Sequence, residues 1–372
     1  MINTLAHRNR FYLFVFLFSL CIVEMAIASI LLEKFSGMGW SATFAEDSEG
    51  YLLVTRYFSG EQIPDTVALF RYRLFSPLIP CVVSYVGKVL PVSSAFFLVN
   101  SLLWIGAAFL FYLFSRELLQ SDDRALACSI IFTTSLPIMV WGLPIMVDMG
   151  AYFFTALIIL LGRRLKTYKG AAVAGLVAGL AILTKPTLVS VLLFLILYQV
   201  SIRAGGRALL IAVVSVTLVM IVYYSLGLEF KDFLSYSTPR HRGVVYVLNS
   251  LFFCFHGGLI LVFWGWKELK ENRRFYVLFS VSVLLFYLPF IHNPRLLFMI
   301  YPAVIPLICA GADTLSQGLS ERFHRDKESV FRLIIFILVV VSNLLTAFYL
   351  MLTRTLALRS IEDLLRALRI FS

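Results

Sequence analysis

Long apolar segments, separated by short polar ones, recur along the whole of this chain. An α-helix rises about 1.5 Å per residue, so about 20 apolar residues cross the roughly 30 Å hydrocarbon layer of a membrane. Suitable segments fall roughly at 11–32, 93–114, 125–142, 145–162, 170–184, 186–202, 208–227, 250–266, 275–291, 296–315 and 331–352. The pattern predicts an all-α polytopic membrane protein with about eleven transmembrane helices. The short fifth and sixth segments meet at Lys185-Pro186, and a re-entrant hairpin there would change the count.

Basic residues gather in alternate loops, which sets the expected orientation. Cytoplasmic loops of membrane proteins carry an excess of Lys and Arg. The basic loops are HRNR near the start, RRLKTYK (163–169), IRAGGR (202–207), KELKENRR (267–274) and ERFHRDK (321–327). We therefore expect a cytoplasmic N-terminus and a first transmembrane helix at 11–32, because that segment is too long for a signal peptide and lacks a small-residue cleavage site.

The long connections fall on the opposite, outer face. They are roughly 33–92 and 228–249, and long loops are where binding and catalysis concentrate. We expect 33–92 to be an outer loop with interfacial helices. The end of the chain, 353–372, is expected to form an amphipathic helix, because SIEDLLRALRIF (360–371) repeats Leu and Ile at helical spacing. The whole chain, 1–372, is predicted to be one transmembrane domain.

Composition supports the membrane class and excludes several kinds of site. The chain has 372 residues, 60% hydrophobic and only 14% charged, with a mean hydropathy of +0.90, far from the usage of soluble domains. There is no Cys/His metal spacing, no Gly-rich phosphate loop and no Ser/His/Asp signature. We therefore expect no metal, no cofactor and no nucleic-acid partner, and a soluble nucleotide-sugar site is unsupported.

Ionisable residues gather at the outer ends of the predicted helices. The carboxylates are Asp47, Glu49 and Asp148, and the cations are Arg71, Arg73, Lys185, Arg240, Arg242 and Arg295. Carboxylates and cations on separate helix ends suit acid–base chemistry beside an anion.

Five features occur in an order that resembles the GT-C membrane glycosyltransferases, which use polyprenyl-phosphate-linked sugars and include protein O-mannosyltransferases and lipid A aminoarabinose transferases. They are DSEGY (47–51), RYRLFSP (71–77), Asp148, AGLVAGLAILTKPT (174–187) and NPRLLFMIYPAVIPL (293–307). Unlike the larger members, this chain is expected to have no C-terminal soluble domain. DSEGY also differs from the acidic pair of several relatives, which leaves open the acceptor and the roles of Glu46 and Glu49.

The resemblance implies a metal-independent hexosyl- or pentosyltransferase that moves a sugar from a polyprenyl-phosphate donor to a lipid, glycan or protein acceptor. It implies inversion, with Asp47 as general base and Glu49 or Asp148 as a candidate second carboxylate. The donor phosphate would be met by Lys185 and Arg295, and the further donor contacts would be Arg71, Arg73, Arg240 and Arg242. We expect the site on the periplasmic face of a bacterial inner membrane, among membrane lipids.

Each candidate also has a simpler interpretation. Asp47 and Glu49 would then be solvated loop carboxylates, and Asp148 a charge favoured by a helix dipole. Basic residues at helix ends commonly snorkel to the interface, which would explain Lys185 and Arg295. The alternative function is a transporter or flippase of a lipid-linked sugar, although the inverted repeats and midplane polar residues typical of transporters are not found. A third interpretation, a scaffold subunit, predicts that the outer charges are dispensable.

Overall fold

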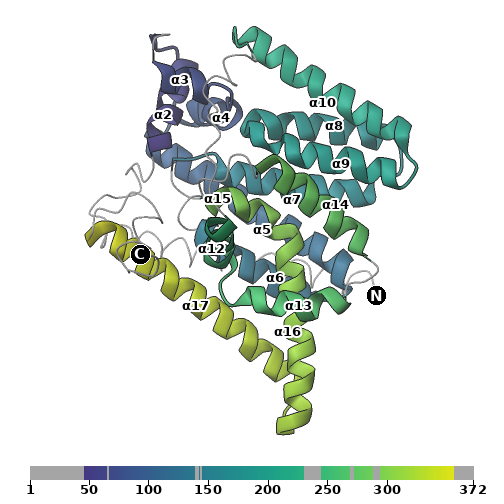
Figure 1. Ribbon diagram of the computed structural model, residues 1–372. Helices are drawn as coiled ribbons and strands as arrows, with labels where there is room; N and C mark the ends of the chain where they lie inside the picture. Colours follow the sequence, from purple (N-terminus) through teal and green to yellow (C-terminus); the bar gives the residue numbers. More distant parts are fainter. Residues whose placement is uncertain are drawn as a thin grey trace, which may run out of the picture.

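The structure is a computed structural model that describes residues 46–64, 67–138, 142, 145–229, 244–268, 272–287 and 294–355. All regular elements in these ranges are helices (Figure 1). Two predictions, the first transmembrane segment at 11–32 and the amphipathic segment after residue 355, lie outside the described residues.

The helices follow one another with short links. In chain order they are α2 (Glu46–Phe58), α3 (Ala68–Arg73), α4 (Leu78–Val86), α5 (Val92–Leu119), α6 (Asp122–Thr133), α7 (Asp148–Arg164), α8 (Tyr168–Thr184), η2 (Pro186–Leu188), α9 (Val189–Ser201), α10 (Gly205–Ser225), α12 (Val244–Phe255), α13 (Gly258–Glu268), α14 (Arg273–Tyr287), α15 (Pro294–Leu297), η5 (Phe298–Ile300), α16 (Tyr301–Phe323) and α17 (Lys327–Thr355).

Within the described part, four helical stretches are long and apolar enough to cross a membrane. They are Val92–Leu119, Gly205–Ser225, Phe298–Phe323 and Lys327–Leu345. Three shorter apolar helices accompany them, at Tyr168–Thr184, Pro186–Ser201 and Gly258–Lys267. The protein is thus an integral membrane protein whose described part is all-helical, while the predicted total of about eleven spans stays a prediction.

An aromatic core joins helices that are distant in sequence. The rings of Phe132 and Tyr301 lie 4.7 Å apart, and Phe111 meets Tyr301 at 5.0 Å. The Tyr301 hydroxyl donates to the Tyr152 carbonyl oxygen at 2.9 Å, and the Tyr152 ring packs edge-on against Phe298 at 5.2 Å. Aromatic pairs of this kind stabilise a core beyond their buried area, and here they tie α5, α6, α7 and α16 together.

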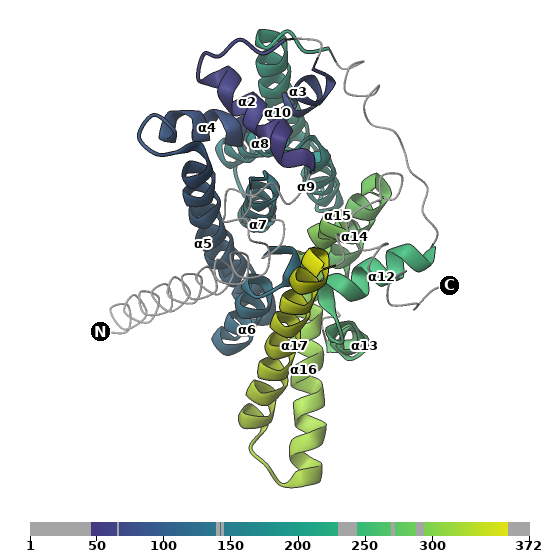
Figure 2. The same cartoon turned by 90° about the vertical axis from the view of Figure 1, so that its left-hand side faces the viewer.

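The helices α2, α3 and α4 form a cap at one end of the bundle, beside the ends of α8 and α10 (Figures 1 and 2). The Tyr223 hydroxyl of α10 donates to the Phe75 carbonyl oxygen at 2.9 Å, and the two rings pack edge-on at 5.2 Å. The segment between α3 and α4 is therefore fixed to the bundle. The predicted outer loop 33–92 thus contains three short helices within its described part.

Ion pairs cluster at the other end of the helices. Arg124 of α6 lies 2.6 Å from Asp313 of α16, and Lys327 of α17 lies 3.1 Å from the same carboxylate. Arg164 pairs with Glu117, joining the end of α7 to the end of α5. The described parts of three basic loops also meet, because Arg207 donates to the Leu165 carbonyl oxygen, Arg163 to Asn272 Oδ1 and Arg274 to the Ser201 carbonyl oxygen. The predicted orientation in the membrane stays a prediction.

Two predicted spans differ in the structure. The segment 125–142 was expected to be one helix, but α6 ends at Thr133. The hydroxyls of Thr133, Thr134 and Ser135 donate to backbone oxygens three or four residues earlier, which competes with the helix, and Pro137 follows. The segment 250–266 was also expected to be one helix, and this was wrong, because the chain breaks between α12 and α13 at His256 and Gly257.

Candidate functional site at the capped end of the bundle

Asp148 and Lys185 form a buried ion pair at the capped end. Asp148 is the first residue of α7 and is 1% exposed; Lys185 follows the last residue of α8 and is 8% exposed. The Lys185 ammonium donates to Asp148 Oδ1. The carboxylate lies at a helix N-terminus and the ammonium at a helix C-terminus, the arrangement that helix dipoles favour. The pair thus places one positive and one negative group together where α7 begins and α8 ends.

Pro186 fixes the geometry of Lys185. The residue before a proline avoids the helical region, and Lys185 has an extended backbone with φ −154° and ψ 114°. Its amide still donates to the Ala181 carbonyl oxygen at 2.9 Å, and its carbonyl accepts from Leu188 at 2.9 Å. The break is therefore hydrogen-bonded on both sides, and the lysine is held at a rigid corner between α8 and η2.

The start of α2 lies against the segment that leads into α7. The Ser48 hydroxyl donates to the Met146 sulfur at 3.8 Å, and Ser48 is fully buried. The Asn100 side-chain amide of α5 donates to the Met146 carbonyl oxygen at 3.1 Å. Asp47 precedes Ser48 in the first turn of α2, and its side chain lies outside the described residues. Its backbone position is thus brought near the residues that precede Asp148.

Arg73 joins the two sequence features that follow Asp47. Its guanidinium lies over the Tyr51 ring, 5.2 Å from the centroid, and over the Tyr72 ring at 4.7 Å. One of its nitrogens donates to the Tyr51 hydroxyl at 3.5 Å. Gly50 permits this contact, because a Cβ there would lie 2.6 Å from Arg73 Cγ. DSEGY and RYRLFSP, read separately in the sequence, are therefore packed against each other, and aromatic faces hold the cation.

The remaining predicted residues are placed less completely. Glu49 of α2 is exposed, and Arg71 of α3 is half-buried. Arg295 is the second residue of α15, but its side chain lies outside the described residues, as do Arg240 and Arg242 entirely. The structure therefore pairs Asp148 with Lys185 and packs Arg73 on α2, whose start lies beside the segment that leads into α7, and it leaves the others as predictions.

Two residues of this region were not predicted from the sequence. Ser48 and Asn100 are fully buried and hold Met146 in place from two different helices. Asn100 had a readable signal, since it is an amide inside the apolar segment 93–114, where polar residues are costly and commonly have a task. Ser48 had none, because a serine beside two acidic residues resembles any polar turn.

Groups of His, Cys, Asp and Glu that could hold a metal do not occur among the described side chains. The chemistry available at this end is that of carboxylates, an ammonium, a guanidinium and tyrosine hydroxyls. Such a set can bind an anion and move a proton.

Comparisons by sequence find no matching family model and no matching curated protein. Solved structures do match. The crystal structure of ArnT from Cupriavidus metallidurans bound to undecaprenyl phosphate matches with a TM-score of 0.56 and 15% identity, and the match covers 91% of this chain and 76% of the ArnT chain. The apo state of the same protein has the same coverage, a TM-score of 0.58 and 14% identity.

The Archaeoglobus fulgidus oligosaccharyltransferase, solved in complex with zinc and sulfate, matches with a TM-score of 0.50 and 14% identity. The match covers 88% of this chain and 53% of the oligosaccharyltransferase chain. The chain has the GT-C fold. The resemblance to this group is thus confirmed for the fold. The roles of the individual residues stay predictions.

Proposed function

We propose that this protein is a membrane glycosyltransferase that moves a sugar from a polyprenyl-phosphate-linked donor to a hydroxyl of a lipid, glycan or protein acceptor. One observation carries the proposal. Asp148, Lys185, Arg73 and the start of α2 converge at one end of a GT-C fold, and a solved structure with that fold is that of ArnT bound to undecaprenyl phosphate.

In this proposal Asp47 is the general base. The acceptor hydroxyl is too weakly acidic to ionise beforehand, so the carboxylate takes its proton as the hydroxyl oxygen bonds to the anomeric carbon. The bond from that carbon to the phosphate oxygen breaks on the opposite side, which inverts the configuration. The bonding electrons leave with the polyprenyl phosphate, whose negative charge therefore increases in the transition state.

Cations at the capped end would stabilise that growing charge. An ammonium has three N–H donors, so Lys185 can hold Asp148 and a phosphate oxygen at once. Asp148 would then act by positioning the ammonium within a buried setting, where electrostatic interactions are stronger than in water. Arg73 and Arg295 would supply further donors, and no metal would be required. The proposed site opens on the outer face, where the acceptor arrives.

A flippase remains the second candidate, and one observation favours it. The break between α12 and α13 interrupts an apolar segment, and discontinuous transmembrane helices are characteristic of transporters. The charged groups of the capped end favour surface chemistry instead, because they lie at the ends of α7 and α8.

The two candidates are separated in reconstituted vesicles. The purified protein receives a radiolabelled polyprenyl-phosphate sugar, and sugar transfer and donor flipping are measured in the same sample. We expect label to move to the acceptor fraction. Flipping without transfer would contradict the proposal and support the flippase. Undecaprenyl phosphate should also raise the melting temperature of the protein, because a ligand that binds only the folded state stabilises it.

A further inference from the structure

The break between α12 and α13 occurs at a residue in an uncommon conformation. His256 has a φ of +50°, which side chains other than glycine rarely adopt. The other described non-glycine residues with positive φ, Gln120, Arg203 and His324, lie one or two residues after the ends of α5, α9 and α16, each of which leads into a polar loop. His256 instead interrupts a run that is apolar on both sides. Irregular backbone at membrane depth is tolerated only where protein buries it or water reaches it.

His256 itself is a buried polar group in need of partners. Its side chain is 5% exposed, and neither ring nitrogen has a hydrogen-bond partner among the described residues. A neutral imidazole carries one N–H donor and one acceptor nitrogen. Native proteins leave few buried polar groups unsatisfied, and ordered water commonly supplies the missing partner.

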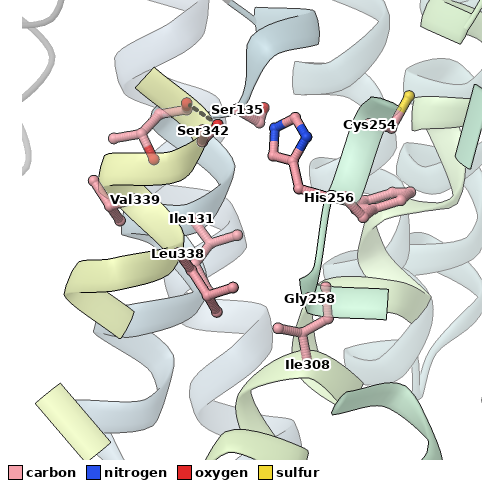
Figure 3. Close-up of a pocket in the computed structure, with 11 residues that line it drawn as sticks. Ile131, Ser135, Cys254, His256, Gly258, Ile308, Leu338, Val339 and Ser342 are labelled. Atoms are coloured by element: carbon pink, nitrogen blue, oxygen red, sulfur yellow. Dashed lines mark hydrogen bonds between the residues drawn. The ribbon is translucent and has the colours of Figure 1, made fainter. Parts of the chain in front are cut away.

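The imidazole points into a small cavity that is also lined by the segment just after α6 and by α17 (Figure 3). The cavity has a volume of about 20 Å³, and Thr134, Ser135 and Ser342 contribute hydroxyls to its lining. A site for one water needs about 10–15 Å³ on this measure and two to four polar partners. The volume and the polar groups both suit one water molecule.

The hydroxyls are oriented as acceptors toward this space. Thr134 donates to the Ile130 carbonyl oxygen, Ser135 to that of Phe132 and Ser342 to that of Thr134, each at 2.8 Å. With its hydrogen used in this way, a hydroxyl can offer a ligand only its oxygen lone pairs. Such a lining does not suit an anion. It contains no carboxylate for a cation either, so the complementary ligand is a small neutral donor and acceptor.

We propose that this cavity binds a single water molecule that bridges His256 and the Ser135 hydroxyl. The water accepts the imidazole N–H, or donates to the bare ring nitrogen, and donates to the serine oxygen. It lies within the bundle rather than in the ion-pair region of Asp148 and Lys185. The bound water supplies the hydrogen bonds that make a histidine-containing break stable between two apolar helices.

The water site is also the joint between two differently anchored helices. Gly265 of α13 and Gly311 of α16 allow close backbone contact, because a Cβ on either would collide with a carbonyl oxygen of the other helix. The preceding helix, α12, packs instead on α15, which carries Arg295. The hydrated break therefore separates a helix fixed to the core from one connected to the predicted donor side.

A double-mutant cycle in melting temperature tests the bridge. His256→Phe and Ser135→Ala should each lower the melting temperature, and the double variant should be hardly lower than the worse single one, because either change removes the shared water. Ser129→Ala is the matched control, since Ser129 is a buried serine of α6, six residues before Ser135, that donates to the Ala108 carbonyl oxygen. Its effect should add to that of His256→Phe. The proposal would be overturned if the effect of Ser135→Ala added to that of His256→Phe as fully as the effect of Ser129→Ala does. A higher melting temperature in His256→Phe would also overturn it.

A measurement on the unaltered protein guards against variants that fail to fold. X-ray hydroxyl-radical footprinting produces radicals from bound water in place, so His256 should be modified although it is buried. Tyr152 is fully buried and should be protected. Protection of His256 to the level of Tyr152 would show that the cavity holds no water.

Discussion

The buried pair of Asp148 and Lys185 should be far more costly to break than to replace as a whole. Their exposures of 1% and 8% leave little water to screen a stranded charge. Asp148→Asn or Lys185→Met alone should therefore reduce the free energy of unfolding by about 3–5 kcal/mol, the usual cost of an uncompensated buried charge. The double variant removes both charges, so its loss should be well below the sum of the single losses, with a coupling of at least about 2 kcal/mol.

A pair outside the site provides the control. Arg164 and Glu117 also form an ion pair, but their side chains are 52% and 31% exposed. Breaking it with Arg164→Met should cost no more than about 1 kcal/mol. The free energies are measured by reversible denaturant titration in mixed micelles, followed by tryptophan fluorescence. If the two single losses at Asp148 and Lys185 simply add, the pair contributes nothing as a unit and the geometry of the site is wrong.

Three further predictions concern packing, the site and orientation. Gly311→Ala should destabilise the protein by at least about 1–3 kcal/mol, because the added methyl meets a backbone oxygen of α13, whereas Gly318→Ala on the same helix meets nothing and should be neutral or slightly stabilising in thermal unfolding. Arg73→Ala should raise KM for the lipid donor and slow turnover. Arg73→Lys should recover only part of the activity, because an ammonium replaces the planar guanidinium with its several donors. Unchanged steady-state kinetics would show that this residue only anchors the chain at the membrane interface. Cysteines at the exposed positions Glu61 and Lys166 should react with an impermeant maleimide from opposite sides of the membrane, and labelling of both from outside would refute the predicted topology.

The sequence predicts at which end of the bundle the charged residues lie, but it does not predict which of them are in contact. Alternating spans put Asp148 and Lys185 on one face, and the structure confirms that they share an end. Their pairing depends on how α7 packs beside α8, which hydropathy does not encode. The same holds for Arg73 and Tyr51, whose contact depends on the missing side chain of Gly50.

The break in the segment 250–266 shows a different limit. Apolar residues continue on both sides of His256, so hydropathy alone predicts one helix. The dipeptide Gly257-Gly258 after a lone histidine was the available signal, because glycines relax the backbone where a helix is interrupted. The sequence could not predict the cavity beside His256, because that cavity also requires Thr134 and Ser135, which follow the early end of α6.

The most direct test of the account is the rate of sugar transfer by Asp47→Asn compared with Glu49→Gln. The asparagine keeps the shape of the side chain and removes the base, so folding and donor binding should persist while turnover falls by about 10² to 10⁴ or more. Glu49→Gln should lose much less, because Glu49 is exposed and is not assigned the proton. If Asp47→Asn keeps most of its activity while Glu49→Gln or Asp148→Asn abolishes it, the base is misassigned. If all three variants transfer sugar at the unaltered rate, the proposed mechanism is contradicted.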